Sequence, residues 1–261
     1  MSEIMNIIQY IFTCILHAVM FLGIVLLPCL CVIAVSQICS SFLRNRITRI
    51  IPLKTFIYLT APGVIVHECG HLVFCLIFGH KVKDVSLFSP RADGTLGYVA
   101  YQYQQNNLYQ RIGLFFIGTG PVWFGFLVLF LISWLFLPNS IFEGGISETA
   151  RIKLFFSSFF SLAFWLDFRR WIWFYLALVI TAHINLSEPD IRGAWQGAVT
   201  LVLLVLIFFL LFGWIRTIKM NSINVGLFLL SKMSPVFCIM FIVSILSFLT
   251  GMVCSLLGGR R

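Results

Sequence analysis

Long apolar stretches separated by short polar ones dominate the chain. A helix needs roughly 20 predominantly apolar residues to cross the hydrocarbon core of a membrane. Six stretches approach or exceed this length, namely 7–36, 55–79, 114–137, 171–185 with the apolar residues before it, 198–215 and 235–257. The pattern predicts an all-α polytopic membrane protein with about six transmembrane helices.

One region departs from this pattern and predicts a small β-hairpin. In residues 82–103, Asp93-Gly94 is a hairpin turn signal, and Pro90 fits an edge strand or a loop. Residues 96–103 then alternate with a period of two, which is typical of a strand. The hairpin directly follows the apolar stretch 55–79.

Composition supports a membrane protein and argues against a nucleic-acid-binding one. Only 10% of the 261 residues are charged, whereas a soluble domain carries about 25%. The net charge of +9 comes from short basic runs beside the apolar stretches, which suits lipid headgroups. The eight cysteines fall mostly inside those stretches and are interpreted as packing residues. We expect a multi-pass protein of the cell membrane of a prokaryote.

No connecting loop is long enough to form a second folded domain. The connection 138–153 has about sixteen residues, far fewer than the roughly 50 that a domain requires. We therefore divide the chain into an N-terminal transmembrane helix with a basic loop (1–54), a membrane core (55–197) and C-terminal transmembrane helices (198–261).

The sequence VHECGH, residues 66–71, places three ionisable side chains in an otherwise apolar stretch. His67 and His71 are four residues apart, so on a helix their directions differ by only about 40°. Both imidazoles can therefore reach one metal ion, and Glu68 can serve as general base, which is the H-E-x-x-H zinc hydrolase pattern. The alternative is a pair of unrelated histidines with a paired glutamate, but isolated charges in lipid are costly.

Catalytic zinc needs a third protein ligand and one open position. The segment TAHINLSEPDIRGAWQG, residues 181–197, interrupts a helix and contains two acidic candidates, Glu188 and Asp190, of which we favour Asp190. His183 is a further candidate, although packing or hydrogen bonding explains it better. His80 lies nine residues after His71, on the opposite face of the helix. Gly193 and Gly197 form a G-x-x-x-G pattern that would bring their helix close to the HECGH helix.

Three elements, in this order, resemble the site-2 protease family of intramembrane zinc metalloproteases. They are HECGH, which matches H-E-x-G-H; Gly120-Pro121, which is similar to the family's Gly-Pro motif; and residues 185–193, which are similar to its Asn–Pro–Asp-Gly element. The resemblance covers roughly residues 55–197. Phe124 stands where the family often has an asparagine, and Pro189 directly precedes Asp190.

The resemblance implies a zinc-dependent endopeptidase that cleaves membrane-protein substrates within the bilayer. His67, His71 and Asp190 would hold Zn²⁺, Glu68 would be the general base, and Asn185 would orient the substrate or the water. An unwound substrate segment would add as a strand to the edge of the hairpin.

Two other functions stay open at this point. The first is a zinc hydrolase that acts on a lipid-linked, non-peptide substrate with the same metal centre. The second is a non-catalytic zinc-binding scaffold or a transporter, although Glu68 is not needed merely to hold zinc. The sequence does not specify an oligomeric state.

Overall fold

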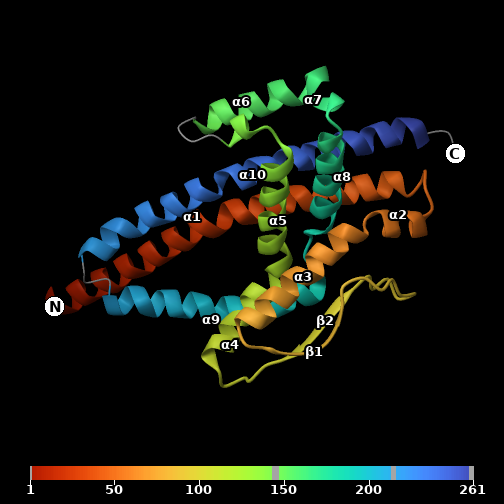
Figure 1. Ribbon diagram of the computed structural model, residues 1–261. Helices are drawn as coiled ribbons and strands as arrows, with labels where there is room; N and C mark the ends of the chain where they lie inside the picture. Colours follow the sequence, from red (N-terminus) through yellow and green to blue (C-terminus); the bar gives the residue numbers. More distant parts are fainter. Residues whose placement is uncertain (1, 143–146, 213–215, 259–261) are drawn as a thin grey trace.

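The computed structural model describes residues 2–142, 147–212 and 216–258 and is mostly helical (Figure 1). The elements follow in chain order as α1 (Ser2–Ile47), α2 (Leu53–Leu59), α3 (Ala61–Ile77), β1 (Lys81–Ser86), β2 (Tyr98–Gln102), α4 (Leu108–Gly118), α5 (Gly120–Phe136), the 3-10 helix η1 (Asn139–Ile141), α6 (Glu148–Phe159), α7 (Leu162–Leu166), α8 (Phe168–His183), α9 (Glu188–Phe212) and α10 (Arg216–Gly258).

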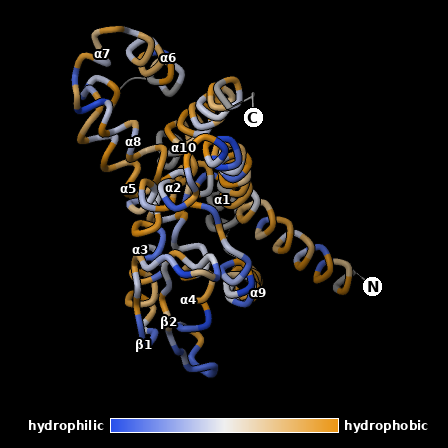
Figure 2. Tube along the Cα trace, turned by 90° about the vertical axis from the view of Figure 1, so that its right-hand side faces the viewer, coloured by the Kyte–Doolittle hydropathy of each residue, from blue (hydrophilic) through white to orange (hydrophobic). Residues whose placement is uncertain are grey.

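Between three and five spans of the described chain are long and apolar enough to cross a membrane. Three are single helices, namely Ile4–Ile47 within α1, the whole of α9, and Phe237–Leu256 within α10. Two more spans result if the bent pairs α2–α3 and α4–α5 each count as one. Figure 2 shows long hydrophobic stretches along the helices, with hydrophilic residues at the hairpin. The expected helices that could cross a membrane are therefore present, but the expected number of about six is not confirmed.

Two of the expected continuous spans are each broken by a sharp bend. The chain turns by 58° between α2 and α3 and by 59° between α4 and α5. Pro62 and Pro121 stand in the first turn of α3 and α5. Proline is tolerated in the first turn of a helix but disrupts the interior of a helix. Each of these prolines therefore ends the preceding helix and lies at the start of a new one. The expected span at 171–185 corresponds to α8, whose 16 residues are fewer than a crossing needs.

The main hydrophobic core lies where α5 and α8 pack together and against α10. Figure 1 shows α5 and α8 side by side across the long helices α1 and α10. Trp173 of α8 is fully buried, and its indole Nε1 donates a hydrogen bond to Ser133 of α5 at 3.0 Å. Met240 and Val243 of α10 are buried in the same cluster. This core holds the end of α8, which leads into the predicted site.

The helices α1 and α10 run side by side in the same direction. Gly226 packs on Ile24 near one end of the pair, and Gly251 packs on Phe42 near the other. Between these two contacts, the buried hydroxyls of Ser36 and Ser244 are hydrogen-bonded at 2.8 Å. This hydroxyl pair joins the two helices at the level of the core.

The predicted hairpin is present and lies next to α3. Strands β1 and β2 pair antiparallel, from Lys81 opposite Gln102 to Ser86 opposite Tyr98, with a bulge between Val82 and Asp84. Gly94 lies at the predicted turn and has a φ of +90°, a conformation that glycine adopts without steric cost. Gly97, directly before β2, packs on Glu68, which places the hairpin beside the helix that carries HECGH.

Candidate metal centre

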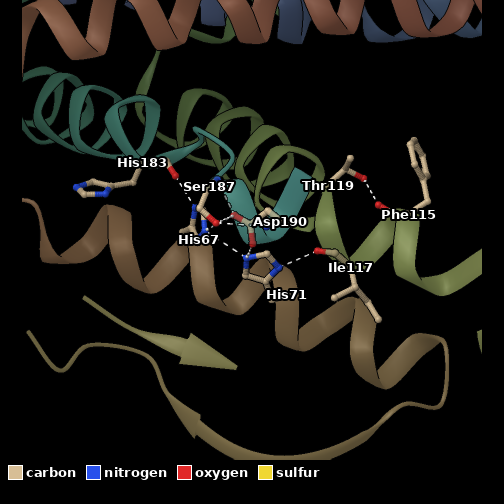
Figure 3. A network of polar contacts seen from close by, with 8 residues as sticks. All are labelled: His67, His71, Phe115, Ile117, Thr119, His183, Ser187 and Asp190. Atoms are coloured by element: carbon tan, nitrogen blue, oxygen red, sulfur yellow. Dashed lines mark hydrogen bonds and ion pairs between the residues drawn. The ribbon is translucent and has the colours of Figure 1, made fainter. Parts of the chain in front are cut away.

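Helix α3 places the two histidines of HECGH on one face. Because four residues make slightly more than one helical turn, the side chains of His67 and His71 project in nearly the same direction. Their Nε2 atoms are 3.2 Å apart. Figure 3 shows both rings directed toward Asp190 at the start of α9. The sequence prediction that the two imidazoles converge is confirmed.

Backbone carbonyls define which nitrogen of each ring carries the proton. His67 Nδ1 lies 2.6 Å from the carbonyl oxygen of His183, and His71 Nδ1 lies 2.7 Å from that of Ile117. A carbonyl oxygen can only accept a hydrogen bond, so each Nδ1 carries the hydrogen and donates it. In a neutral ring, the lone pair then belongs to Nε2. Metal-binding histidines usually have this arrangement, with the other ring nitrogen donating to a carbonyl or carboxylate.

A capping box at the start of α9 orients the carboxylate of Asp190. Ser187 is the N-cap residue, and its backbone N–H and hydroxyl donate to Asp190 Oδ2 at 2.8 and 2.6 Å. The Asp190 N–H lies 3.4 Å from the Ser187 hydroxyl oxygen and donates to it. This reciprocal pairing between the N-cap residue and the third residue of a helix is a known N-terminal motif. It limits the rotation of the Asp190 side chain.

Three electron-pair donors therefore meet at one point. Asp190 Oδ1 lies 3.1 Å from His71 Nε2, and Asp190 Oδ2 lies 3.6 Å from His67 Nε2. One ligand atom from each residue fits within 4.8 Å of the others, the only such group in the described part of the chain. Lone pairs at these distances require a cation between them, either a proton or a metal ion. Two imidazole nitrogens and one carboxylate oxygen fit a divalent metal, and this is a ligand composition of catalytic zinc.

Glu68 lies beside this group in a cleft of about 650 Å³. Its side chain is buried, and only 7% of the residue is exposed. The hairpin covers it, because a Cβ added at Gly97 would lie 2.7 Å from the Glu68 Cγ. The expected general base thus has access to the same cavity as the three candidate ligands.

The structure separates the remaining candidates for the third ligand. Glu188 is exposed, is not among the residues that line the cleft, and forms an ion pair with Arg192 at 3.3 Å. His183 contributes its backbone carbonyl, while its imidazole packs near Gly63 and is outside the three-residue group. His80 is also outside this group, as expected, and its Nε2 donates to the Gln110 carbonyl at 2.8 Å. Asp190 is therefore the acidic residue that meets the histidines.

Asn185, expected to orient the substrate or the water, lines the cleft. Its amide nitrogen donates to the carbonyl of Ala182 at 3.3 Å. Its Oδ1 is buried and has no hydrogen-bond partner in the described chain. A buried acceptor without a partner is costly, so this oxygen is available to accept a hydrogen bond from a bound molecule.

Two expectations about the neighbouring helices are wrong. Asp190 and Glu188 do not lie in an irregular break but in the first turn of α9, because Ser187 caps that helix. Gly197 does not bring α9 against α3. A Cβ at Gly197 would lie 2.1 Å from the backbone nitrogen of Phe115, so its partner is α4.

Several residues that build the site were not predicted from the sequence. Ser187 is one, although the spacing S-x-x-D of residues 187–190 is a recognisable capping signal. Gln37, Ser41 and Arg44 of α1 are others, and all three line the cleft. The resemblance covers only residues 55–197, so this first helix was placed outside the membrane core, and no local signal connects it to the site.

Tyr101 of β2 was also not singled out, and it lines the same cleft. Burial is the main cause that raises the pKa of its phenol to about 12, and the negative charge of Asp190 contributes in the same direction. The hydroxyl therefore stays protonated at neutral pH and can donate a hydrogen bond.

Comparison of the chain with protein-family models, curated proteins and solved structures gave no match. The family resemblance therefore depends on the three sequence elements alone. In the structure these elements are neighbours. Gly70 of HECGH contacts Gly120 of the Gly-Pro element, and His71 of HECGH contacts Asp190 of the third element.

Proposed function

We propose that this protein is a zinc-dependent endopeptidase of the site-2 protease type that cleaves membrane-protein substrates within or near the bilayer. The observation that carries the proposal is the convergence of two Nε2 atoms, on rings whose Nδ1 atoms face backbone carbonyls, with a capped carboxylate and with the buried Glu68 in the same cleft. Two of the three single helices that are long and apolar enough to cross a membrane, α1 and α9, line this cleft. Buried ionisable groups in such surroundings usually serve a function.

His67, His71 and Asp190 would hold the zinc ion, which supplies Lewis-acid polarisation of a carbonyl and increases the acidity of water. The carbonyls of His183 and Ile117 keep both rings in the tautomer that leaves Nε2 free. Glu68 accepts a proton from the attacking water as the oxygen–carbon bond forms. It then delivers this proton to the amide nitrogen as the carbon–nitrogen bond breaks.

The hairpin offers an edge for an extended substrate. In the described chain, β2 pairs with β1 on one side, and its residues Tyr98, Val99 and Tyr101 line the cleft. A peptide added at this edge would make main-chain hydrogen bonds, which is a recurrent mode of recognition. A helical substrate must first unwind, because its own hydrogen bonds shield its carbonyls. The free Oδ1 of Asn185 would accept a hydrogen bond from the bound backbone.

The proposal is tested with Glu68→Gln, which keeps the size of the side chain and removes the base. The purified variant should retain the metal, and its cleavage of a labelled transmembrane peptide should fall by about 10²–10⁴-fold. Glu188→Gln, in the first turn of the same α9 helix as Asp190 but exposed and paired with Arg192, should cleave normally. Cleavage by Glu68→Gln at the wild-type rate contradicts the assignment.

Two further measurements on the same proteins separate the peptidase from the other two functions. A lipid-linked amide or ester substrate that is hydrolysed while the peptide is left intact contradicts peptide specificity. Zinc uptake into proteoliposomes that is unchanged in Glu68→Gln, without any hydrolysis by the wild type, indicates a transporter.

A further inference from the structure

Tyr101 places a hydroxyl beside the first turns of α9, the helix that carries the candidate ligand Asp190. It lies in β2, and its hydroxyl oxygen is 3.9 Å from the position that a Cβ would take at Gly193. Gly193 follows Asp190 by three residues, which is just under one turn of α9. Strand β2 thus brings the phenol against the turn of α9 that carries the carboxylate ligand.

The same chain segment passes Glu68 at its other end. Residues 97, 99 and 101 share one face of the extended chain, because side chains alternate with a period of two. All three line the cleft. Gly97 packs on Glu68, and Tyr101 packs near Gly193, about 13 Å further along the chain at about 3.3 Å per residue. This segment therefore contacts the proposed base at residue 97 and carries the phenol at residue 101, and both positions line the cleft.

Packing holds the phenol ring in place. Its centroid is 5.3 Å from the imidazole of His80, which is anchored to the Gln110 carbonyl at 2.8 Å. Tyr103 also stacks on this imidazole, with a centroid distance of 5.4 Å. A hydroxyl on a ring held in this way is positioned before the substrate arrives.

Two other polar groups of the cleft already have acceptors. The Ser187 hydroxyl donates to Asp190 at 2.6 Å, and the Asn185 amide nitrogen donates to the Ala182 carbonyl at 3.3 Å. The Ser187 hydroxyl has a single hydrogen and would have to break this contact in order to donate to a substrate, whereas the Asn185 amide nitrogen retains one N–H. Tyr101 combines a position next to α9 with a hydroxyl that faces the cleft.

We propose that the Tyr101 hydroxyl donates a hydrogen bond to the substrate oxygen that becomes negatively charged when the scissile carbonyl turns tetrahedral. This inference rests on the proposed peptidase function. No proton is transferred, and Glu68 remains the only group that accepts and returns one. Donors placed where negative charge develops stabilise the transition state more than the ground state.

The test removes the hydroxyl and keeps the ring. Tyr101→Phe should lower kcat by about 10²–10³-fold with little change in KM, which is the usual effect of removing one oxyanion donor. Zinc content and thermal unfolding should match the wild type, because the ring still packs on His80. The matched control is Tyr103→Phe, which loses a hydroxyl from a ring that also packs on His80 but does not line the cleft, and it should keep wild-type kcat.

A binding measurement provides a readout independent of turnover. A phosphinic peptide carries a tetrahedral, negatively charged centre in place of the scissile amide. Isothermal titration calorimetry should show a Kd about 10²-fold higher for Tyr101→Phe than for the wild type. The matching amide peptide, titrated into Glu68→Gln with and without Tyr101→Phe, should bind equally to both proteins.

The outcomes separate this inference from the function on which it rests. If the wild type cleaves the peptide, Glu68→Gln does not, and Tyr101→Phe keeps kcat and phosphinate affinity within about threefold, the inference is wrong and the peptidase assignment stands. If Tyr101→Phe weakens the amide and the phosphinic peptide equally, Tyr101 contributes only to ground-state binding and the inference is also wrong. A wild type that binds zinc and cleaves no peptide contradicts both.

Discussion

The backbones of Gly70 and Gly120 are in direct contact. A Cβ at Gly70 would lie 2.7 Å from the carbonyl carbon of Gly120, and a Cβ at Gly120 would lie 2.7 Å from the Gly70 oxygen. Each distance is too short for any other residue, so the two glycines together allow α3 to touch the start of α5. This contact lies between His67 and His71 along α3, and it sets how close His71 comes to the Ile117 carbonyl.

We therefore expect Gly70→Ala to separate α3 from α5 and to weaken the metal site. The cost of the steric overlap should be about 1–3 kcal/mol of stability, as for other overpacked positions. Thermal unfolding in detergent and zinc content measure the two effects. The control is Gly23→Ala in α1, where no atom lies within 4 Å of the added Cβ, so unfolding should be unchanged or occur at a higher temperature. Full zinc content in a stable Gly70→Ala protein contradicts this account.

Ser187→Ala should weaken metal binding even though Ser187 is not a ligand. Loss of the hydroxyl removes a 2.6 Å hydrogen bond to Asp190 and frees the carboxylate to rotate. Removal of such a supporting contact typically lowers metal affinity by about 10–100-fold. A competition titration with a zinc chelator measures this affinity. Ser147→Ala removes the equivalent N-cap of α6, far from the site in sequence, and should leave zinc affinity unchanged.

The two acidic residues at the start of α9 should behave differently. Asp190→Asn keeps the shape of the side chain but removes the charge that balances the cation, so zinc should be lost. Glu188→Gln breaks only an exposed ion pair with Arg192, which contributes little to stability, and zinc should be retained. Metal analysis of both variants checks this assignment. Zinc loss in Glu188→Gln with full retention in Asp190→Asn would reverse it.

The stability of the hairpin attachment should depend on pH through His80. Burial lowers the pKa of this imidazole below its usual value of about 6.5. In the unfolded chain the imidazole of His80 binds a proton near pH 6.5. In the folded protein the same imidazole binds a proton only at a lower pH. Stability is therefore fully present above about pH 6.5 and falls as the pH drops toward the folded pKa.

His80→Gln removes this titration and should lose less stability between about pH 7.5 and about pH 5.5 than the wild type does. Thermal unfolding at both pH values measures the difference. Both proteins contain the same metal-site histidines, so the contribution of these histidines cancels in the comparison. Equal losses in the two proteins would show that His80 does not titrate in this range.

Features that depend on residues close together in the sequence could be predicted from the sequence. The four-residue spacing of His67 and His71 determines that they share a face, whatever surrounds the helix. The spacing of Ser187 and Asp190 likewise encodes a capping box, although we interpreted that segment as irregular. The hairpin was predicted because Asp93-Gly94 and the alternation after it are local signals.

Features that depend on contacts between distant segments could not be predicted in this way. The apolar run 114–137 hides the bend at Thr119, because hydropathy does not register that Pro121 begins a new helix. The close approach of Gly197 to Phe115 was assigned to the wrong helix, since a G-x-x-x-G pattern indicates close packing but not the partner. The Arg44 side of the cleft likewise follows only from the packing of α1 on the core.

The central claim is that His67, His71 and Asp190 bind one divalent metal ion, and metal analysis of the purified protein tests it most directly. Elemental analysis of the detergent-solubilised wild type should give one equivalent of zinc, and His71→Ala, purified in parallel and shown to be folded, should give close to none. A folded wild-type protein that contains no metal and takes up none after incubation with Zn²⁺ would contradict the account, and the three side chains would then share only a proton.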